Sequence, residues 1–247
     1  MTSRTLRAWL LAAATAVTAV QGQVLSPGTP PSQPAPQLPV QAEYMRAHFN
    51  QAMVVHAAII RGDLGAVAPA ARVLAEQDPG AMPTGSAAHV NAMKEAARQA
   101  VEAPDILAAG QATARMLTAC GNCHRAVGTM PALASRARPP VGGVVGHMVD
   151  HQMAVDLMLQ GLVVPSDSLW RQGTRAMATT PLHARELPVD SSVRRELAPT
   201  EQRVHRMATE AAQATDPVAR AGFYGQMLAG CADCHKRHPK IWGPKPL

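Results

Sequence analysis

Apolar residues recur every three or four positions along most of the chain, and strand-forming residues never gather into alternating runs. Ala, Leu, Met, Gln, Glu and Arg, which favour helices, fill these stretches. The pattern predicts an all-α chain. The expected helices span residues 41–61, 64–76, 86–102, 105–124, 144–160, 166–178, 200–215 and 216–236.

Small and polar residues mark the expected helix ends. Gly62 is placed to end the first helix, and Asp63 to cap the start of the next. Asp105 opens the fourth run, and Asp216 followed by Pro217 opens the last. Short loops between amphipathic helices predict antiparallel neighbours.

The N-terminal region has a different character. Arg4 and Arg7 precede an apolar stretch at 8–20 that is too short to span a bilayer comfortably, so residues 1–22 are expected to be a cleaved signal peptide. Residues 23–40 are rich in proline and predict an extended linker. The protein is therefore expected to be exported to the periplasm, with a membrane tether only if the signal segment is retained and no integral span after cleavage.

Composition adds two constraints. Only 3% of the 247 residues are aromatic although 47% are hydrophobic, so a large flat group is expected to complete a core poor in bulky side chains. The formal charge of +6 falls to +4 without Arg4 and Arg7, and no lysine-rich or basic-aromatic run appears. Nucleic acid is not expected as a partner, whereas an acidic protein surface is compatible with this charge.

All four cysteines fall in two copies of the pattern C-x-x-C-H. They are Cys120, Cys123 and His124, and then Cys231, Cys234 and His235. On a helix, positions i, i+3 and i+4 share one face, so two thioethers can hold haem vinyl groups while the imidazole reaches iron.

Zinc and a redox-active dithiol are the alternatives for these cysteines. A zinc ribbon joins two C-x-x-C knuckles over a short spacing, but 107 residues separate Cys123 from Cys231. A thioredoxin-like dithiol needs a βαβ context, and neither alternative explains the histidine after each motif. The sequence therefore predicts two covalently attached haem c groups.

The chain is also internally repeated. An offset of 111 aligns the two motifs and pairs Asp105 with Asp216, while an offset of 99 aligns 47–62 with 146–161. The prediction is two tandem four-helix bundles, each with one haem c. They comprise residues 41–128 and 142–247, joined by a linker at 129–141.

A four-helix bundle with C-x-x-C-H near the end of its fourth helix resembles cytochrome c prime and its low-spin relatives. The resemblance covers residues 41 to about 237. It implies that the haem packs between helices four and one of each bundle, and that a residue on helix one decides the chemistry at iron. The relatives have an apolar residue or a Met there, and this chain departs from both.

The potential ligands that recur at matching positions of both first helices are His48 and His147. Each belongs to an apolar stripe, so both are predicted to bind iron opposite His124 and His235. His56 and His151 are the next candidates, and an open iron is the fallback. Four other histidines are expected on surfaces, in loops or away from iron: His89, His183, His205 and His238. Met residues at helical spacing are expected to pack in the core.

Iron with two protein ligands has no position for a substrate, so the predicted function is non-enzymatic relay of single electrons between periplasmic redox proteins. The alternative is a five-coordinate haem protein that binds or senses NO or CO. A di-haem peroxidase is a third hypothesis, but the duplicated motif shows no division of labour.

Overall fold

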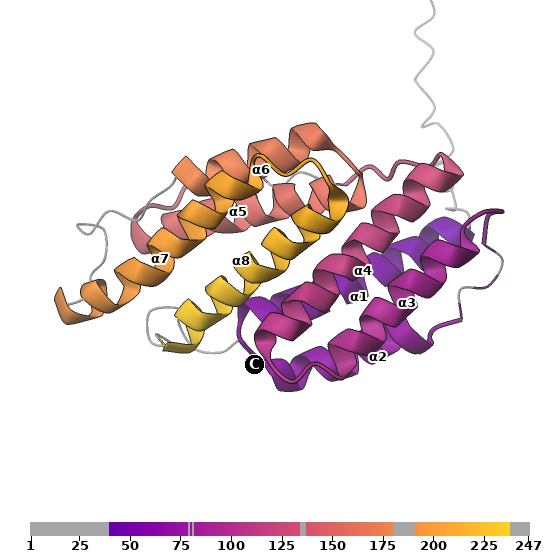
Figure 1. The fold of residues 1–247 in the computed structure, drawn as a ribbon, viewed down its shortest axis with the longest axis horizontal. Helices are drawn as coiled ribbons and strands as arrows, with labels where there is room; N and C mark the ends of the chain where they lie inside the picture. The colour runs from indigo at the N-terminus through magenta and orange to yellow at the C-terminus, as the bar shows by residue number, and fades with distance from the viewer. Residues whose placement is uncertain (1–39, 79, 81, 134–136, 180–190, 238–247) are drawn as a thin grey trace, which may run out of the picture. The chain divides into compact units, whose positions relative to one another are not determined.

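The computed structural model describes residues 40–78, 80, 82–133, 137–179 and 191–237. The predicted signal peptide and proline-rich linker lie outside these residues, as do His183 and His238. The described part is entirely helical and contains no strand, which confirms the all-α prediction (Figure 1).

The helices follow one another in two groups of four. The first half of the described chain comprises α1 (Val40–Ile60), α2 (Leu64–Glu76), α3 (Ala87–Val101) and α4 (Ile106–Val127). The second half comprises α5 (Gly143–Val163), α6 (Asp167–Thr179), α7 (Ser191–Ala211) and α8 (Pro217–Arg237). None of these helices is both long and apolar enough to cross a membrane.

Helix α7 departs most from the predicted boundaries. It begins at Ser191, nine residues before the predicted start at residue 200, and therefore contains Pro199, which removes a backbone donor inside the helix. The helix continues through Pro199 because Leu197, Thr200 and Val204 form one buried face. Packing of that face compensates for the single backbone donor that proline removes.

The predicted caps at the helix ends are confirmed. The Asp63 carboxylate accepts a hydrogen bond from the amide of Ala66 at 3.1 Å, and Asp105 accepts one from Ala108 at 2.7 Å. Asp216 caps α8 in the same way. Gly62 ends α1 with a φ of 70°, a left-handed conformation that favours glycine.

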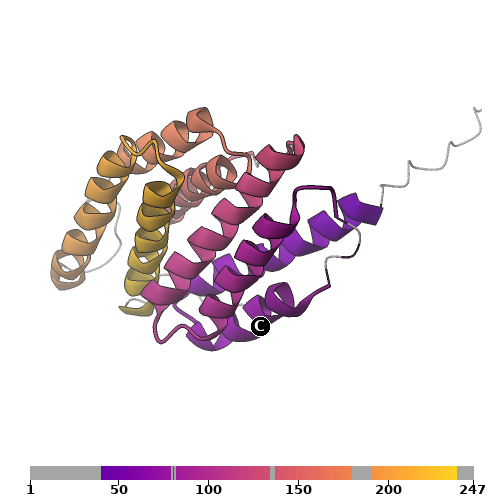
Figure 2. The ribbon, with the colours of Figure 1, turned by 45° about the vertical axis from the view of Figure 1, so that its right-hand side comes forward.

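Within each half, helices adjacent in the chain pack side by side, and the fourth helix returns to the first. The two halves also pack on each other, chiefly through α4 against α8, with further contacts of α4 with α5 and of α1 with α8 (Figure 1, Figure 2). Buried side chains from both halves form one hydrophobic cluster. Residues 38–247 are accordingly one compact unit.

Small residues allow α4 and α8 to approach closely. A methyl group on Gly110 would lie 2.7 Å from the carbonyl oxygen of Gly225, and one on Gly225 would lie 2.7 Å from the Cα of Gln111. Ala114 and Ala221, one turn away on the same helices, are also buried. The backbones of the two helices are therefore in direct contact. The linker at 129–141 has no periodic apolar face, which predicts that segments 41–128 and 142–247 each fold alone. This stays a prediction, and either segment alone would expose the contact surface between α4 and α8.

This crossing predicts opposite effects for two glycine substitutions. Gly110→Ala should lower the free energy of unfolding by about 1–3 kcal/mol, because its methyl group meets a backbone oxygen that cannot move aside. Gly222→Ala is the matched control, since a methyl group there meets nothing within 4 Å. That variant should gain about 0.5–1 kcal/mol from helix propensity. Urea unfolding followed by circular dichroism measures both, and equal effects would contradict the close crossing.

Candidate functional site

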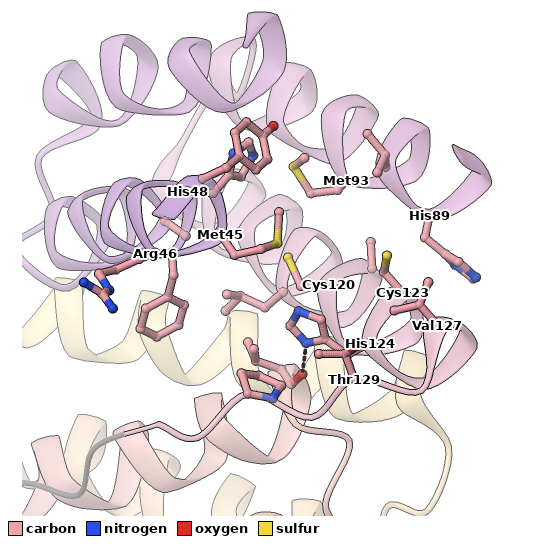
Figure 3. A pocket seen from close by; sticks show the side chains of 18 of the residues that line it. Met45, Arg46, His48, His89, Met93, Cys120, Cys123, His124, Val127 and Thr129 are labelled. Carbon is pink, nitrogen blue, oxygen red and sulfur yellow. Dashed lines mark hydrogen bonds between the residues drawn. The ribbon is translucent and has the colours of Figure 1, made fainter. Parts of the chain in front are cut away.

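A cavity of about 570 Å³ lies beside the first C-x-x-C-H motif. Its walls come mainly from α1, α3, α4 and the start of the 129–141 linker, with Leu74 of α2, Met82 and Pro83 of the following loop, and Val163 of α5, and they are mostly apolar (Figure 3). Thr129, Pro131 and Leu133 of the linker contribute to these walls. The volume and lining are typical of a site for a large organic ligand.

Cys120, Cys123 and His124 from the last turns of α4 all line this cavity. Both thiols are free. Burial raises the pKa of Cys120 to about 12, and burial also raises the pKa of Cys123. Reactive dithiols require a lowered thiol pKa, so this environment disfavours the dithiol alternative.

The His124 ring is held by a backbone group of the other half. Its Nδ1 lies 2.9 Å from the carbonyl oxygen of Val163, the last residue of α5 (Figure 3). Since a carbonyl oxygen only accepts, Nδ1 carries the proton and donates. Nε2 is then the nitrogen with a lone pair, which is the form that binds a metal ion.

His48 enters the same cavity from α1, with Met45 and Cys120 between it and His124 in the view of Figure 3. It is 7% exposed, and neither ring nitrogen has a hydrogen-bond partner among the residues that the structure describes. Burial, and secondarily the charge of Lys94, lowers the pKa of His48. A buried, neutral and unpartnered imidazole is costly unless a ligand uses it, and iron coordination would supply that partner. The residues present therefore fit a haem at this position.

Several neighbouring residues lie differently from the expectations. Met45 and Met93, expected only to pack in the core, also line the cavity. His89, expected on a surface or in a loop, is half-buried on α3 and lines the cavity as well, because α3 packs over the motif.

The second motif repeats the arrangement of the first. Burial raises the pKa of Cys231 to about 12 and that of Cys234 to about 11. The Nδ1 atom of His235 lies 2.9 Å from the carbonyl oxygen of Ile60, the last residue of α1. Burial lowers the pKa of His235, and this hydrogen bond opposes the shift.

Polar side chains surround His147, which is 7% exposed on α5. The rings of His147 and His151 are 4.1 Å apart, and His205 of α7 lies 5.3 Å from His151. Glu201 approaches Nε2 of His205 at 3.5 Å and Nε2 of His147 at 3.9 Å. The charge of Glu201 also contributes to the raised pKa of Cys234, so α5, α7 and α8 converge here.

Two of these residues were not anticipated. His205 was expected on a surface or in a loop, but its side chain is 13% exposed and its Nδ1 contacts the carbonyl oxygen of Met177. It is largely covered, although not fully buried, because α7 packs against α6. Glu201 was overlooked, although its position one turn before His205 on a predicted helix was the available signal.

His56, the next candidate ligand after His48, belongs to a different environment. It is 1% exposed, and its Nε2 shares a 2.8 Å hydrogen bond with the Tyr224 hydroxyl of α8. It is not among the residues that line the cavity. Because His56 is on α1 and Tyr224 is on α8, their hydrogen bond joins the two halves of the described chain.

No group of three His, Cys, Asp or Glu side chains among the described residues is arranged to hold a metal ion by itself. Comparison of the chain with protein-family models, curated proteins and solved structures finds no match.

The buried His56 predicts a loss of stability in mild acid. Burial lowers its pKa from 6.5 to about 4, so only the unfolded chain takes up this proton between those pH values. The contribution of neutral His56 to the free energy of unfolding is fully present above pH 6.5 and is lost as the pH falls to about 4. The loss amounts to about 3 kcal/mol. Urea unfolding at several pH values measures it.

The double variant His56→Leu with Tyr224→Phe is the control, because it removes the ionisable ring without leaving the hydroxyl unpaired. Its free energy of unfolding should vary less with pH in this window. The same slope in the parent and the double variant would contradict the assignment to His56.

Proposed function

We propose that this protein is an exported di-haem c-type cytochrome, similar to cytochrome c prime in its bundle, that relays single electrons and catalyses no reaction of its own. In this proposal the two groups of four helices are tandem haem bundles. The observation that carries it is the first cavity, where the Cys120, Cys123 and His124 motif meets the buried, unpartnered imidazole of His48.

Each motif residue has a distinct role in the proposal. The thiols of Cys120 and Cys123, and of Cys231 and Cys234, form the thioethers that fix a haem c. His124 and His235 bind iron through Nε2, which the hydrogen bonds at Nδ1 support. When bound, haem c supplies a one-electron couple between ferric and ferrous iron.

His48 and His147 are proposed as the second protein ligands. With imidazoles on both faces, no coordination position is left for substrate or gas, which favours electron relay over gas binding. The walls of the first cavity are mostly apolar, which suits the hydrocarbon faces of a haem. The Met45 thioether is the competing ligand at this site, and a His/Met pair would serve the same function at a higher potential.

The proposed partners are periplasmic redox proteins. Arg125 and Lys236, each directly after a motif histidine, are exposed. They place positive charge next to the sites where electrons would enter and leave, which suits partners with acidic docking surfaces.

Covalent attachment is tested by mass. The parent, expressed with export and haem-ligation machinery, should carry two haem c groups, and the variant Cys231→Ala with Cys234→Ala should carry one. Intact-protein mass spectrometry counts them. A parent without covalent haem, or one that binds zinc through these cysteines, would contradict the proposal.

The axial ligands are tested by spectroscopy. The oxidised parent should give low-spin electron paramagnetic resonance signals typical of two imidazoles. His48→Ala should convert roughly half of the haem to a high-spin form that binds carbon monoxide when reduced, because His124 and the thioethers still hold the group. His147→Ala should act in the same way at the second haem.

His89→Ala is the matched control, since His89 lines the same cavity but is not a proposed ligand. Its spectra should equal those of the parent. An unchanged His48→Ala spectrum would assign the ligand to another group, with Met45 the nearest candidate. Rapid carbon monoxide binding at both haems of the parent would favour the gas-binding function instead.

A further inference from the structure

The hydrogen bonds of the two motif histidines form a reciprocal pair. His124 of the first half bonds to the last carbonyl of α5, and His235 of the second half bonds to the last carbonyl of α1, both at 2.9 Å. Resting on the function proposed above, we propose that each half supplies the group that orients the iron-binding histidine of the other half. The two haem sites are thus built jointly.

The carbonyls of Ile60 and Val163 are well suited to this role. At the end of α1, Gly62 and Asp63 donate to the carbonyls of Ile59 and Ala58, and the Ile60 carbonyl accepts from the imidazole. Both carbonyls also lie at the partially negative end of a helix. A strong acceptor at Nδ1 makes the imidazole a more basic ligand, which stabilises ferric iron and lowers the reduction potential.

Close packing fixes the first of these contacts. Gly121, inside the first motif, faces the end of α5, and a methyl group there would overlap the carbonyl oxygen of Leu162 and lie 3.3 Å from Cγ of Pro165. The motif backbone is therefore seated directly on the last turn of α5.

The second contact uses the complementary arrangement. Ala232 occupies in the second motif the position that Gly121 has in the first, and the residue facing it is Gly62 at the end of α1. A methyl group on Gly62 would be 3.7 Å from Cβ of Ala232. One partner of each contact is thus a glycine, which lets each motif approach the helix end that holds its histidine.

The first helix of each half, α1 or α5, therefore contributes to both proposed haem sites. Helix α1 carries His48, the proposed ligand of the first haem, and Ile60, which holds His235 of the second. These residues are 12 positions apart, or about 18 Å along a helix. Helix α5 carries His147 and Val163, which are 16 positions apart, or about 24 Å along a helix.

The experiment compares three full-length proteins loaded with haem: the parent, Gly121→Ala and the control Gly222→Ala. The added methyl of Gly121→Ala must push the end of α5 away from the motif and weaken the bond from His124 to Val163. In a potentiometric titration its first-haem midpoint potential should rise while the second stays unchanged. The midpoint potential of the first haem is identified by comparison with the Cys231→Ala, Cys234→Ala protein, which should carry only that haem.

Nuclear magnetic resonance measures the two hydrogen bonds directly, through the exchange of the ring N–H protons with solvent. The ring N–H protons of His124 and His235 should both be protected from solvent exchange. In Gly121→Ala the His124 proton should exchange roughly tenfold faster, while that of His235 should not change. Gly222→Ala should match the parent in both measurements, since its methyl group meets no neighbour.

The outcomes separate this inference from the proposed function. Two covalent haems with unprotected ring protons in the parent, or with a first potential that Gly121→Ala leaves unchanged, would overturn the reciprocal arrangement and leave electron relay standing. A parent without covalent haem would overturn both. If Gly121→Ala does not fold, Ala232→Leu provides the reciprocal test, with the second potential rising and the first unchanged.

Discussion

The contact between α4 and α8 is the constraint on which the other features depend. Gly110 and Gly225 bring the two backbones together, and no larger residue fits without moving a helix. Because both helices carry a C-x-x-C-H motif near their ends, their crossing fixes each motif relative to the other half. The interface between the two halves also contains the hydrogen bonds of His124 to the end of α5 and of His235 to the end of α1. The hydrogen bond between Tyr224 and His56 lies in it as well.

Local signals in the sequence were sufficient for the helices and for the chemistry of the motifs. Asp63 and Asp105 act through hydrogen bonds within three residues, so their roles could be predicted from neighbouring letters. The start of α7 could not be predicted in this way, because burial of Leu197 by other helices outweighs the local effect of Pro199. The bond from His124 to Val163 spans 39 residues and depends on how the halves pack, which no pattern of spacing contains.

The two candidate sites differ more than the repeated motif implies. His48 stands in an apolar cavity without a hydrogen-bond partner, whereas His147 has Glu201 and His151 beside it. This difference arises because the two repeats carry different residues at matching positions. One example is Ala52 in the first half, which matches His151 in the second. If the proposed haems are bound, a carboxylate near one and hydrocarbon near the other would give the two irons unequal affinities for an electron, and that difference would give the proposed relay a direction.

The reciprocal contacts also bear on the origin of the chain. If residue i of one half touches residue j of the other, and the counterpart of j touches the counterpart of i, the halves are related by an approximate twofold axis. The pairs His124 with Val163 and His235 with Ile60 approach this form: the motif histidines are counterparts and both carbonyls are at helix ends, but Val163 lies one turn beyond Leu159, the counterpart of Ile60. Two identical subunits meeting through such an isologous surface would each have completed the other. A fusion of two such genes would keep the interface and leave each copy free to diverge, as the difference between Ala52 and His151 at matching positions illustrates.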